Sequence, residues 1–305
     1  MIKLIKCPDG GSTVKEECLS GKCRLGRRCA PVTYLQLVCR EREWKGIPSV
    51  TQLLQGTREA YLKITSDFTA DPQQATFRVL GTRGHTALEI DNDFSFTEEH
   101  FEGGDLQGTA DLLEKQENGE WWLIDHKTAG SFKVAKAIGL VKMEEVLTDE
   151  NGAPLKHKNG KPKKKVWWEV TPESLKSREV DIKDWIYQLN AYRLKMEEQL
   201  GEKITRLWIF AVVRDGGTFS AKNRGVLENF YYIPIPILDD DVIRSYFSVK
   251  RLMLINALEK KEIPPECSPE ECWNGRKCQM CEVAETCAKY GRSYLTADEV
   301  EDGQG

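Results

Sequence analysis

Runs of apolar residues predict four β-strands in this chain. Residues 107–115 and 121–127 are predicted as two strands of a hairpin, because the Asn-Gly pair between them is a strong hairpin signal. Residues 204–213 are almost continuously apolar and rich in β-branched and aromatic side chains, which favours a strand buried on both faces. Residues 230–237 contain prolines that cannot donate ladder hydrogen bonds, so this strand is expected at a sheet edge.

Two long helices are predicted near these strands. Residues 181–200 form the first, with Asp181 as its N-cap and Gly201 as its stop. Residues 239–262 form the second, with aspartates in the first turn and lysines near the end, an order that complements the helix dipole. Hairpin, helix and strand in this sequence indicate an α/β fold, in which helices flank a mixed central sheet.

The length of the hairpin turn decides which side chains face each other. A two-residue Asn-Gly loop would point Asp111 and Asp125 to opposite faces of the hairpin. A three-residue loop over residues 117–119, with Gly119 in the left-handed conformation, places the two aspartates directly opposite each other. We predict the three-residue loop, or a β-bulge with the same effect. Lys127 then shares the face of Asp125, because side chains alternate along a strand.

Two carboxylates and a lysine on one face favour metal-dependent cleavage of a phosphodiester. Carboxylates bind hard divalent cations, the cation activates a water, and a lysine holds that water or the developing charge. An exposed hairpin with ordinary surface charges is the alternative. Aspartate is poorly suited to a strand interior, so Asp125 within an apolar strand, matched by Asp111, favours the site.

The hairpin segments resemble a known nuclease motif. Gly-Thr-Ala-Asp111 and Ile-Asp125-His-Lys127 are similar to the core of the PD-(D/E)xK nucleases, and most similar to its RecB-like branch, which includes recombination exonucleases and CRISPR-associated iron–sulfur exonucleases. The resemblance covers about residues 49–215. It implies a restriction-endonuclease-like core and a metal-dependent deoxyribonuclease.

The resemblance also implies roles for residues outside the hairpin. The branch carries a histidine upstream on a helix and a Gln-xxx-Tyr pair downstream, and this chain has His85, Gln188 and Tyr192 in that order. His85 would then bind Mg²⁺ or Mn²⁺ together with the two aspartates. The carbonyl of His126 is a further expected ligand. Gln188 and Tyr192, one helical turn apart, would position Lys127 or the DNA strand.

The overall composition is that of an intracellular protein. The chain has 305 residues, 30% of them charged, a net charge of −4 and no apolar run of membrane-spanning length. Residues 1–7 are too short for a signal peptide. We therefore expect a cytoplasmic protein encoded by a bacterium, an archaeon or a phage. A net acidic chain can bind DNA only where positive charge is local.

One segment concentrates that charge. Residues 156–165 contain six lysines and no carboxylate, within an insertion of about residues 141–170. Two interpretations are open. Either the segment binds DNA, with lysines on phosphates and an aromatic ring on bases, or it is a solvated and poorly ordered loop. The candidate DNA-binding residues are Lys163, Lys164, Lys165 and Trp167.

The ten cysteines fall into two groups, with none between Cys39 and Cys267. Without an export signal, metal binding is expected rather than a disulfide framework. The first group is Cys7, Cys18, Cys23 and Cys29. Its Gly-, Lys- and Arg-rich surroundings cannot bury a core, so we expect a structural Zn²⁺ to fold this segment.

The second group resembles the C-terminal three-cysteine motif of the iron–sulfur RecB-like nucleases, in Cys278-Gln-Met-Cys281 and Cys287. That family takes a fourth ligand from just before the nuclease core, where this chain has no cysteine. Cys272, Cys267 or a folded-back Cys39 are the remaining candidates. We expect Cys272, Cys278, Cys281 and Cys287 to bind a [4Fe–4S] cluster or Zn²⁺.

These observations predict three regions: a cysteine-rich metal-binding module at residues 1–40, a nuclease core at 41–262, and a cysteine cluster with an acidic tail at 263–305. The expected activity is an exonuclease that hydrolyses DNA in replication, recombination or repair. A recombinase or annealing protein is a possible partner, and no membrane is expected. Structure-specific or endonucleolytic cleavage, RNA as substrate, and a non-catalytic DNA-binding protein are the alternatives.

Overall fold

The computed structural model describes residues 1–41, 43–88, 90, 95–103 and 105–291, with no side-chain description at 83–88, 102 and 103. The chain forms two compact units. Their boundaries differ from those of the three expected regions, because both ends of the chain belong to one unit and the expected core is divided between the two. Unit 1 comprises Met1–Thr86, His100–Gly108 and Asp239–Gly305, and unit 2 comprises Ala87–Glu99 and Thr109–Leu238.

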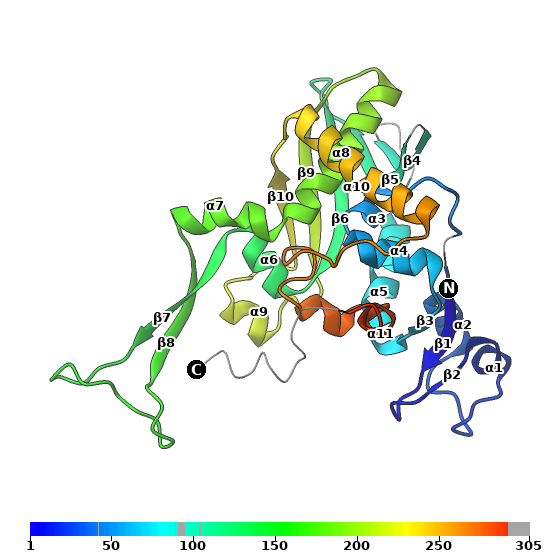
Figure 1. Ribbon diagram of the computed structural model, residues 1–305. Helices are drawn as coiled ribbons and strands as arrows, with labels where there is room; N and C mark the ends of the chain where they lie inside the picture. The colour runs from blue at the N-terminus through cyan, green and yellow to red at the C-terminus, as the bar shows by residue number, and fades with distance from the viewer. Residues whose placement is uncertain (42, 89, 91–94, 104, 292–305) are drawn as a thin grey trace. The chain divides into compact units, whose positions relative to one another are not determined.

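A mixed five-stranded sheet carries the predicted hairpin, with strand order β10-β9-β6-β5-β4 (Figure 1). Strands β6 and β9 are parallel, whereas β5 and β10 run antiparallel to their neighbours β6 and β9. The edge position of β10 confirms the expectation from its prolines. The strands are β4 (Ser95–Gly103), β5 (Leu106–Lys115), β6 (Trp121–Ala129), β9 (Ile204–Val213) and β10 (Phe230–Ile235).

The hairpin between β5 and β6 has the predicted three-residue turn. The Gln116 N–H donates to the Glu120 carbonyl at 2.8 Å, and the Gly119 N–H donates back to the Gln116 carbonyl at 2.9 Å. Gly119 has φ +85°, a conformation that costs an L-residue about 1–2 kcal/mol. The resulting register pairs Leu112 with Ile124, and continuing it by one step places Asp111 opposite Asp125.

Helix α8 (Lys183–Leu200) packs against β6, β9 and β10 in unit 2. It ends where expected, at a left-handed Gly201. The prediction that Asp181 is its N-cap is wrong, because Asp181 is the last residue of α7 (Pro172–Asp181) and Ile182 occupies the cap position. The carboxylate of Asp181 instead binds Lys136 of α6 (Ser131–Ala137), at 2.7 Å.

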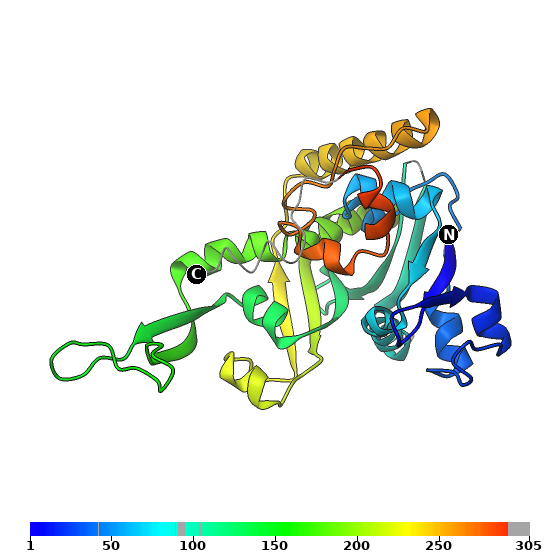
Figure 2. The same cartoon turned by 60° about the horizontal axis from the view of Figure 1, so that its bottom comes forward.

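The insertion forms an ordered β-arm. Strands β7 (Leu140–Val146) and β8 (Lys164–Val170) pair over their whole length, from Leu140↔Val170 to Val146↔Lys164. Figure 2 shows the strand pair leaving the helices α6 and α7. Beyond the paired strands, two short turns close the arm, one at Asp149–Ala153 and one at His157–Lys161. The lysine-rich segment, residues 156–165, lies mostly in these turns, and only its last two residues belong to β8.

In unit 1 the first strand pairs with two others, in the order β2-β1-β3. Strand β3 comes from residues 68–70, so residues 1–40 share a sheet with later sequence. The strands are β1 (Ile2–Lys6), β2 (Ser12–Val14) and β3 (Phe68–Ala70). The short helices nearby are α1 (Lys15–Ser20) and α2 (Val32–Val38), and they bury Cys18, Leu35 and Val38.

The predicted long helix after β10 is present as α10 (Asp240–Lys260), with the Asp239 side chain capping its first turn. It packs on α3 (Val50–Leu53) and α4 (Thr57–Thr65), and α11 (Ala284–Ala288) also contacts α4. A 3₁₀ turn, η1 (Arg276–Met280), lies between α10 and α11 in the sequence. Helices α5 (Pro72–Leu88) and α9 (Phe219–Asn223) complete the described helices. None of the described helices has the length and apolar character needed to span a membrane.

Candidate active site

The side chains of Asp125 and Lys127 lie on the α8 side of the sheet in unit 2. Asp125 is only 1% exposed, although it is a carboxylate. It lies between the buried strands β5 and β9, opposite Ile209 in the parallel register. Burying a charge is costly unless it is paired, so the contacts of this carboxylate decide what the site can do.

A continuous polar chain links the strand to the helix. The Lys127 ammonium lies 2.6 Å from Asp125 Oδ2 and donates to Gln188 Oε1 at 3.2 Å. The Gln188 amide in turn donates to the Tyr192 hydroxyl at 3.0 Å and to Asp125 Oδ1 at 3.4 Å. The structure therefore brings together four of the residues singled out from the sequence, and Gln188 contacts the other three.

The side chain of the second aspartate, Asp111, accepts a hydrogen bond from the backbone of β6. Asp111 is 9% exposed, and its Oδ2 accepts the His126 N–H at 2.7 Å. A carboxylate thus takes the place of a strand carbonyl at this end of the hairpin. The His126 ring packs edge-on against Phe210, 5.8 Å between centroids, on the opposite side of β6 from Asp125. This placement leaves only the backbone of His126 near the two aspartates.

The charges around Lys127 keep it protonated. Burial lowers the pKa of the Lys127 ammonium, but the negative charges of Asp125 and Asp111 more than offset this, and the pKa lies above its usual value. The ammonium is therefore a fixed positive charge beside the two carboxylates. It can hold a water or a phosphate oxygen by donating hydrogen bonds.

One acidic residue of this face was missed from the sequence. Asp184 lies one helical turn before Gln188 on α8, and its negative charge also raises the pKa of Lys127. It forms an ion pair with Lys133 at 3.2 Å. Asp184, Gln188 and Tyr192 are spaced by four residues, which places them on one face of the helix. This spacing is the feature of the sequence from which Asp184 could have been predicted to lie near Gln188 and Tyr192.

A second missed group fixes the chain just after β6. The Asp215 carboxylate accepts the backbone N–H of Ser131 at 2.6 Å and its hydroxyl at 2.7 Å. These hydrogen bonds lower the pKa of Asp215. Arg224 also donates to the Ser131 hydroxyl, at 2.9 Å. The end of β6 and the start of α6 are thereby tied to the loop after β9.

The expected metal ligands are met only in part. The His85 side chain lies outside the described residues. Among the side chains that the structure describes, no group of three or more His, Cys, Asp or Glu is arranged to hold a metal ion. Asp111 and Asp125 still offer the oxygen donors that suit Mg²⁺ or Mn²⁺. In this conformation their charges are partly balanced by Lys127 and by the His126 N–H.

The C-terminal cysteines converge on one pocket in unit 1. Cys267, Cys272, Cys278, Cys281 and Cys287 all line it, beside Glu59 and Lys277. Its volume is about 40 Å³, room for one ion. Burial, reinforced by the charge of Glu59, raises the pKa of Cys281 to about 11. Metal binding at this pocket would have to displace thiol protons.

Two of the three candidates for the fourth C-terminal ligand remain. Cys267 and Cys272 both line the pocket. The third, Cys39, packs instead against the N-terminal core around Ile5, Cys18 and Leu35, so the folded-back alternative is wrong. Gly56 leaves room for Cys267, since a Cβ at residue 56 would lie 2.2 Å from the Cys267 sulfur. The segment that lacks a cysteine therefore contacts one from the C-terminal group.

The N-terminal cysteines lie near one another, but in the part of the chain that the structure describes they form no group arranged to hold a metal ion. Burial raises the pKa of the Cys18 thiol, and the nearby thiols of Cys29, Cys23 and Cys7 raise it further. Cys7 and Cys18 are buried, whereas Cys29 is exposed. Tight turns with a left-handed glycine follow both Cys7 and Cys23, closed by the hydrogen bonds Gly10 N–H to Cys7 and Gly26 N–H to Cys23.

The candidate DNA-binding residues lie on the β-arm, but they differ in availability. Lys164 is ion-paired with Glu144 at 2.7 Å, and Lys165 lies over the Trp167 ring at 5.5 Å. Lys163 is exposed at the end of the paired strands. The neighbouring Trp168 packs edge-on against Phe132 of α6, 6.2 Å between centroids, and so joins the arm to the rest of unit 2.

Comparisons with known proteins add little to this geometry. No family profile matches the sequence, and no curated protein matches it significantly. One solved structure, "Crystal structure of SSO0001", is similar over 92% of this chain and 97% of its own, with 17% identity and a TM-score of 0.42. At that TM-score the similarity supports no inference. The function must be argued from the site.

Proposed function

We propose that this protein is a metal-dependent deoxyribonuclease of the PD-(D/E)xK type, acting as an exonuclease. The observation that carries the proposal is the buried chain Lys127–Asp125–Gln188–Tyr192, with Asp111 across the hairpin. A scaffold gains nothing from two carboxylates on adjacent strands, because like charges in a buried site repel each other. Catalysis gives them a purpose.

The residues would divide the chemistry among them. Asp111 and Asp125, with His85 and the His126 carbonyl, would hold Mg²⁺ or Mn²⁺, which supplies Lewis-acid activation of water and neutralises charge on the phosphate. Lys127, whose ammonium lies beside both carboxylates, would orient the attacking water and stabilise developing negative charge. Gln188 holds the ammonium by its carbonyl oxygen, at 3.2 Å.

Tyr192 acts one step further from the phosphate. Its hydroxyl accepts the Gln188 amide N–H at 3.0 Å, which fixes the amide so that its oxygen faces Lys127. Gln188 and Tyr192 are thus positioning residues for the lysine. The helix that carries them is packed against β6 and β9, so the arrangement is held by the sheet.

We also propose a metal at the C-terminal cysteine pocket. Thiolates bind Zn²⁺ and iron–sulfur clusters, and Cys272 or Cys267 would act beside Cys278, Cys281 and Cys287; the cavity volume of about 40 Å³ favours the single ion. The pocket lies between α4 and the C-terminal segment, so a metal would hold that segment to unit 1. The first cysteine group, with Cys7, Cys18, Cys23 and Cys29, is the second proposed Zn²⁺ site.

The test is cleavage of end-labelled linear DNA, single- and double-stranded, beside covalently closed circles. Wild type and Lys127→Ala would be compared with Mn²⁺, Mg²⁺ or EDTA. We expect loss of linear DNA only, with either metal, and a loss of about 10²–10³-fold or more in the variant. Cutting of the circles would make the enzyme an endonuclease. No cleavage in any lane, with DNA binding retained, would refute the nuclease proposal.

A further inference from the structure

The β-arm ends in two lobes with the same turn and opposite charge. In one lobe Asp149 N–H donates to Ala153 and Gly152 N–H to Asp149; in the other, His157 N–H donates to Lys161 and Gly160 N–H to His157. Gly152 and Gly160 have φ +81° and +80°. The turn sequences are Asp149-Glu-Asn-Gly and His157-Lys-Asn-Gly. The two turns therefore have the same backbone conformation, but one lobe is acidic and the other is basic.

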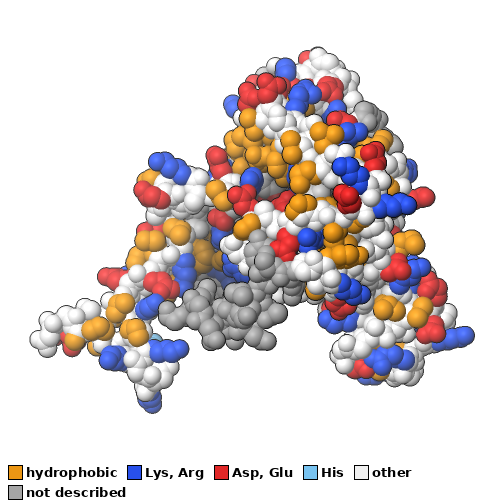
Figure 3. Space-filling view, viewed as in Figure 1, with side chains coloured by type: hydrophobic (Ala, Val, Ile, Leu, Met, Phe, Trp, Pro, Cys, Tyr) orange, Lys and Arg blue, Asp and Glu red, His pale blue; other side chains and the backbone are white. Residues whose placement is uncertain are grey.

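The basic lobe presents unneutralised positive charge. Lys156, Lys158, Lys161 and Lys163 are all exposed, and within the described part of the chain no ion pair joins them to a carboxylate. Figure 3 shows the basic side chains gathered at the lower lobe of the arm. By contrast, Lys142 and Lys164 at the base of the lobes are both held by Glu144. Four lysines are thus available to bind an anion.

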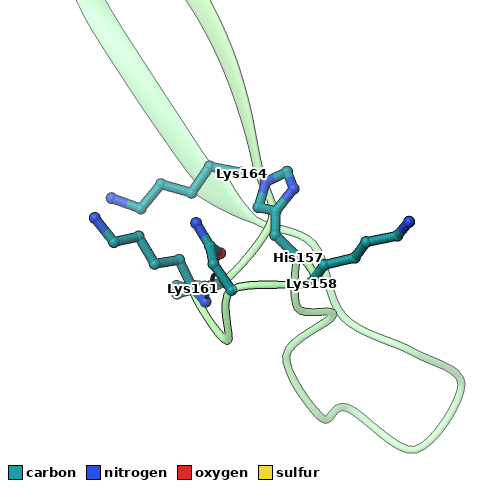
Figure 4. A pocket seen from close by; sticks show the side chains of 6 residues that line it. His157, Lys158, Lys161 and Lys164 are labelled. Atoms are coloured by element: carbon teal, nitrogen blue, oxygen red, sulfur yellow. Dashed lines mark hydrogen bonds between the residues drawn. The ribbon is translucent and has the colours of Figure 1, made fainter.

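The lobe is shaped as well as charged. His157, Lys158, Lys161 and Lys164 line an open hollow of about 870 Å³. In Figure 4 Lys161 and Lys164 extend to one side of the lobe, and Lys158 extends to the other. Backbone hydrogen bonds at the junction hold the lobe in place, from Leu155 N–H to Leu147 and from Lys163 N–H to Leu155. These hydrogen bonds fix the backbone that carries the lysines, so less backbone entropy is lost on ligand binding than with an unstructured loop.

The arm is also anchored to the elements that carry the candidate active site. It leaves through α6, which directly follows β6, and it returns through α7, which directly precedes α8. Lys133 and Lys136 of α6 both bind Asp181 at the end of α7, at 2.6 and 2.7 Å. The Ser174 hydroxyl of α7 donates to the Gly139 carbonyl at the root of the arm. A ligand bound to the arm would therefore be fixed relative to Asp125 and Lys127.

We propose that the basic lobe binds the phosphate backbone of the DNA substrate away from the cleaved bond; the inference rests on the proposed nuclease function. Four solvated lysines on an ordered turn suit a row of phosphates, which release counterions on binding. The seven paired residues of β7 span about 23 Å, at about 3.3 Å per residue. That length corresponds to about seven phosphates of one strand, at about 3.4 Å each.

The test measures binding and cleavage separately. Binding of a fluorescent duplex of about 30 base pairs would be followed by anisotropy without added Mg²⁺ or Mn²⁺, so that cleavage does not interfere, for wild type and for Lys156, Lys158, Lys161 and Lys163 all changed to Gln. We expect at least a tenfold weaker binding near 50 mM salt, and a salt slope reduced by up to about 3.6. A Lys→Arg set at the same positions should restore both, because the charge is retained.

The acidic lobe provides the matched control. The double variant Asp149→Asn with Glu150→Gln removes two negative charges from a turn of the same conformation. DNA binding by this variant should be unchanged or slightly tighter. Cleavage of oligonucleotides much shorter than about seven nucleotides should not differ between wild type and the Lys→Gln set, because an oligonucleotide bound at the candidate active site would not reach the lobe.

The outcomes separate the two proposals. Equal binding and equal salt slope in the Lys→Gln set, with cleavage intact, would overturn the arm proposal and leave the nuclease standing. Lobe-dependent binding without cleavage in any metal would refute the nuclease and retain the arm as a DNA-binding element. A changed oligomeric state in the Lys→Gln set, with DNA binding unaltered, would assign the lobe to a second copy of the chain and overturn the proposal.

Discussion

The β5–β6 hairpin and the β7–β8 arm use the same turn and put it to opposite uses. Gly119, Gly152 and Gly160 all follow an asparagine, adopt φ between +80° and +85°, and donate to the carbonyl three residues before them. The first hairpin lies in a five-stranded sheet, and the arm is a separate two-stranded sheet. What differs is the surroundings: one hairpin is backed by α8, and the other faces solvent.

The surroundings decide how the charges behave. Asp125 is 1% exposed, so its carboxylate must be matched by Lys127 and Gln188, and removing any one of them leaves a buried group unsatisfied. The lysines of the basic lobe are solvated, and each acts almost independently through its charge. We therefore expect steep effects from single changes in the hairpin and graded effects from the arm.

The largest effect is expected from removing a buried charge. Asp125→Asn takes away a proposed metal ligand and the ion-pair partner of Lys127, and we expect cleavage to fall by about 10²–10³-fold or more. Asp149→Asn, the same change in the acidic lobe, should leave cleavage rates unchanged. Steady-state cleavage with Mn²⁺ and far-ultraviolet circular dichroism would be compared for both. A fully active Asp125→Asn variant would show that this hairpin is not the active site.

A smaller loss is expected one step from the charge. Gln188→Ala removes one hydrogen bond to Lys127 and one to Asp125, and hydrogen bonds to charged groups contribute about 1.5–3 kcal/mol, so cleavage should fall about 10- to 150-fold. Tyr192→Phe keeps the ring and loses only the hydroxyl that orients the Gln188 amide, so its loss should be smaller. A Tyr192→Phe variant slower than Gln188→Ala would instead place the tyrosine hydroxyl at the phosphate. The readout is the rate at saturating DNA, because a positioning role lowers the rate rather than the affinity.

Strain at equivalent glycines should separate the two regions by stability. Gly119→Ala and Gly160→Ala each force an alanine into the left-handed conformation, at a cost of about 1–2 kcal/mol, and neither new Cβ meets an atom within 4 Å. In the hairpin the strain acts on the sheet, so Tm should fall by about 2–8 °C. In the arm the lobe can open locally without unfolding the unit, so Tm should be unchanged. Equal Tm shifts in both variants would show that the arm unfolds together with the sheet.

The same comparison shows what the sequence could predict. The Asn-Gly turn was sufficient to predict the strands β5 and β6, because a hairpin is a local feature. It left two registers open, and the three-residue turn that we predicted is the one that the structure contains. The long helices and the edge strand β10 also followed from local patterns, such as Gly201 and the prolines. The mixed α/β architecture was predicted on that basis, and the structure supports it at that level.

Features that depend on tertiary contacts were missed. The two Asn-Gly turns of the arm carried the same signal as the first, but the dense lysines of residues 156–165 left DNA binding and a poorly ordered loop equally open. Asp184 was missed, because its closeness to Lys127 depends on how α8 packs on the sheet. The convergence of Cys267 with Cys272 on one pocket depends on Gly56, more than two hundred residues away in the sequence. The metals expected at both cysteine groups remain proposals.

The smallest expected effect sharpens the account of the arm. Hydrogen bonds from Lys142 and Lys164, together with their charges, hold the pKa of Glu144 at about 2, so this carboxylate is ionised throughout the range in which the protein would be assayed. Stability from these contacts is lost only as the pH falls through that pKa, and two lysines stay neutralised above it. Changing the pH between about 5 and 8 should therefore not alter DNA binding through this group.

A substitution at Glu144 can free Lys142 and Lys164 from their ion pairs, which a change of pH in the assay range cannot do. Glu144→Gln leaves Lys142 and Lys164 without their carboxylate, and if the arm lies along DNA they add up to two phosphate contacts. We expect binding to tighten about two- to fivefold at low salt, with a salt slope steeper by up to about 1.8. Asp149→Asn, which adds the same charge at the acidic lobe, is the control and should change binding less. Weaker or unchanged binding in Glu144→Gln would mean that the paired strands of the arm face away from the DNA, and would confine the contact to the basic lobe.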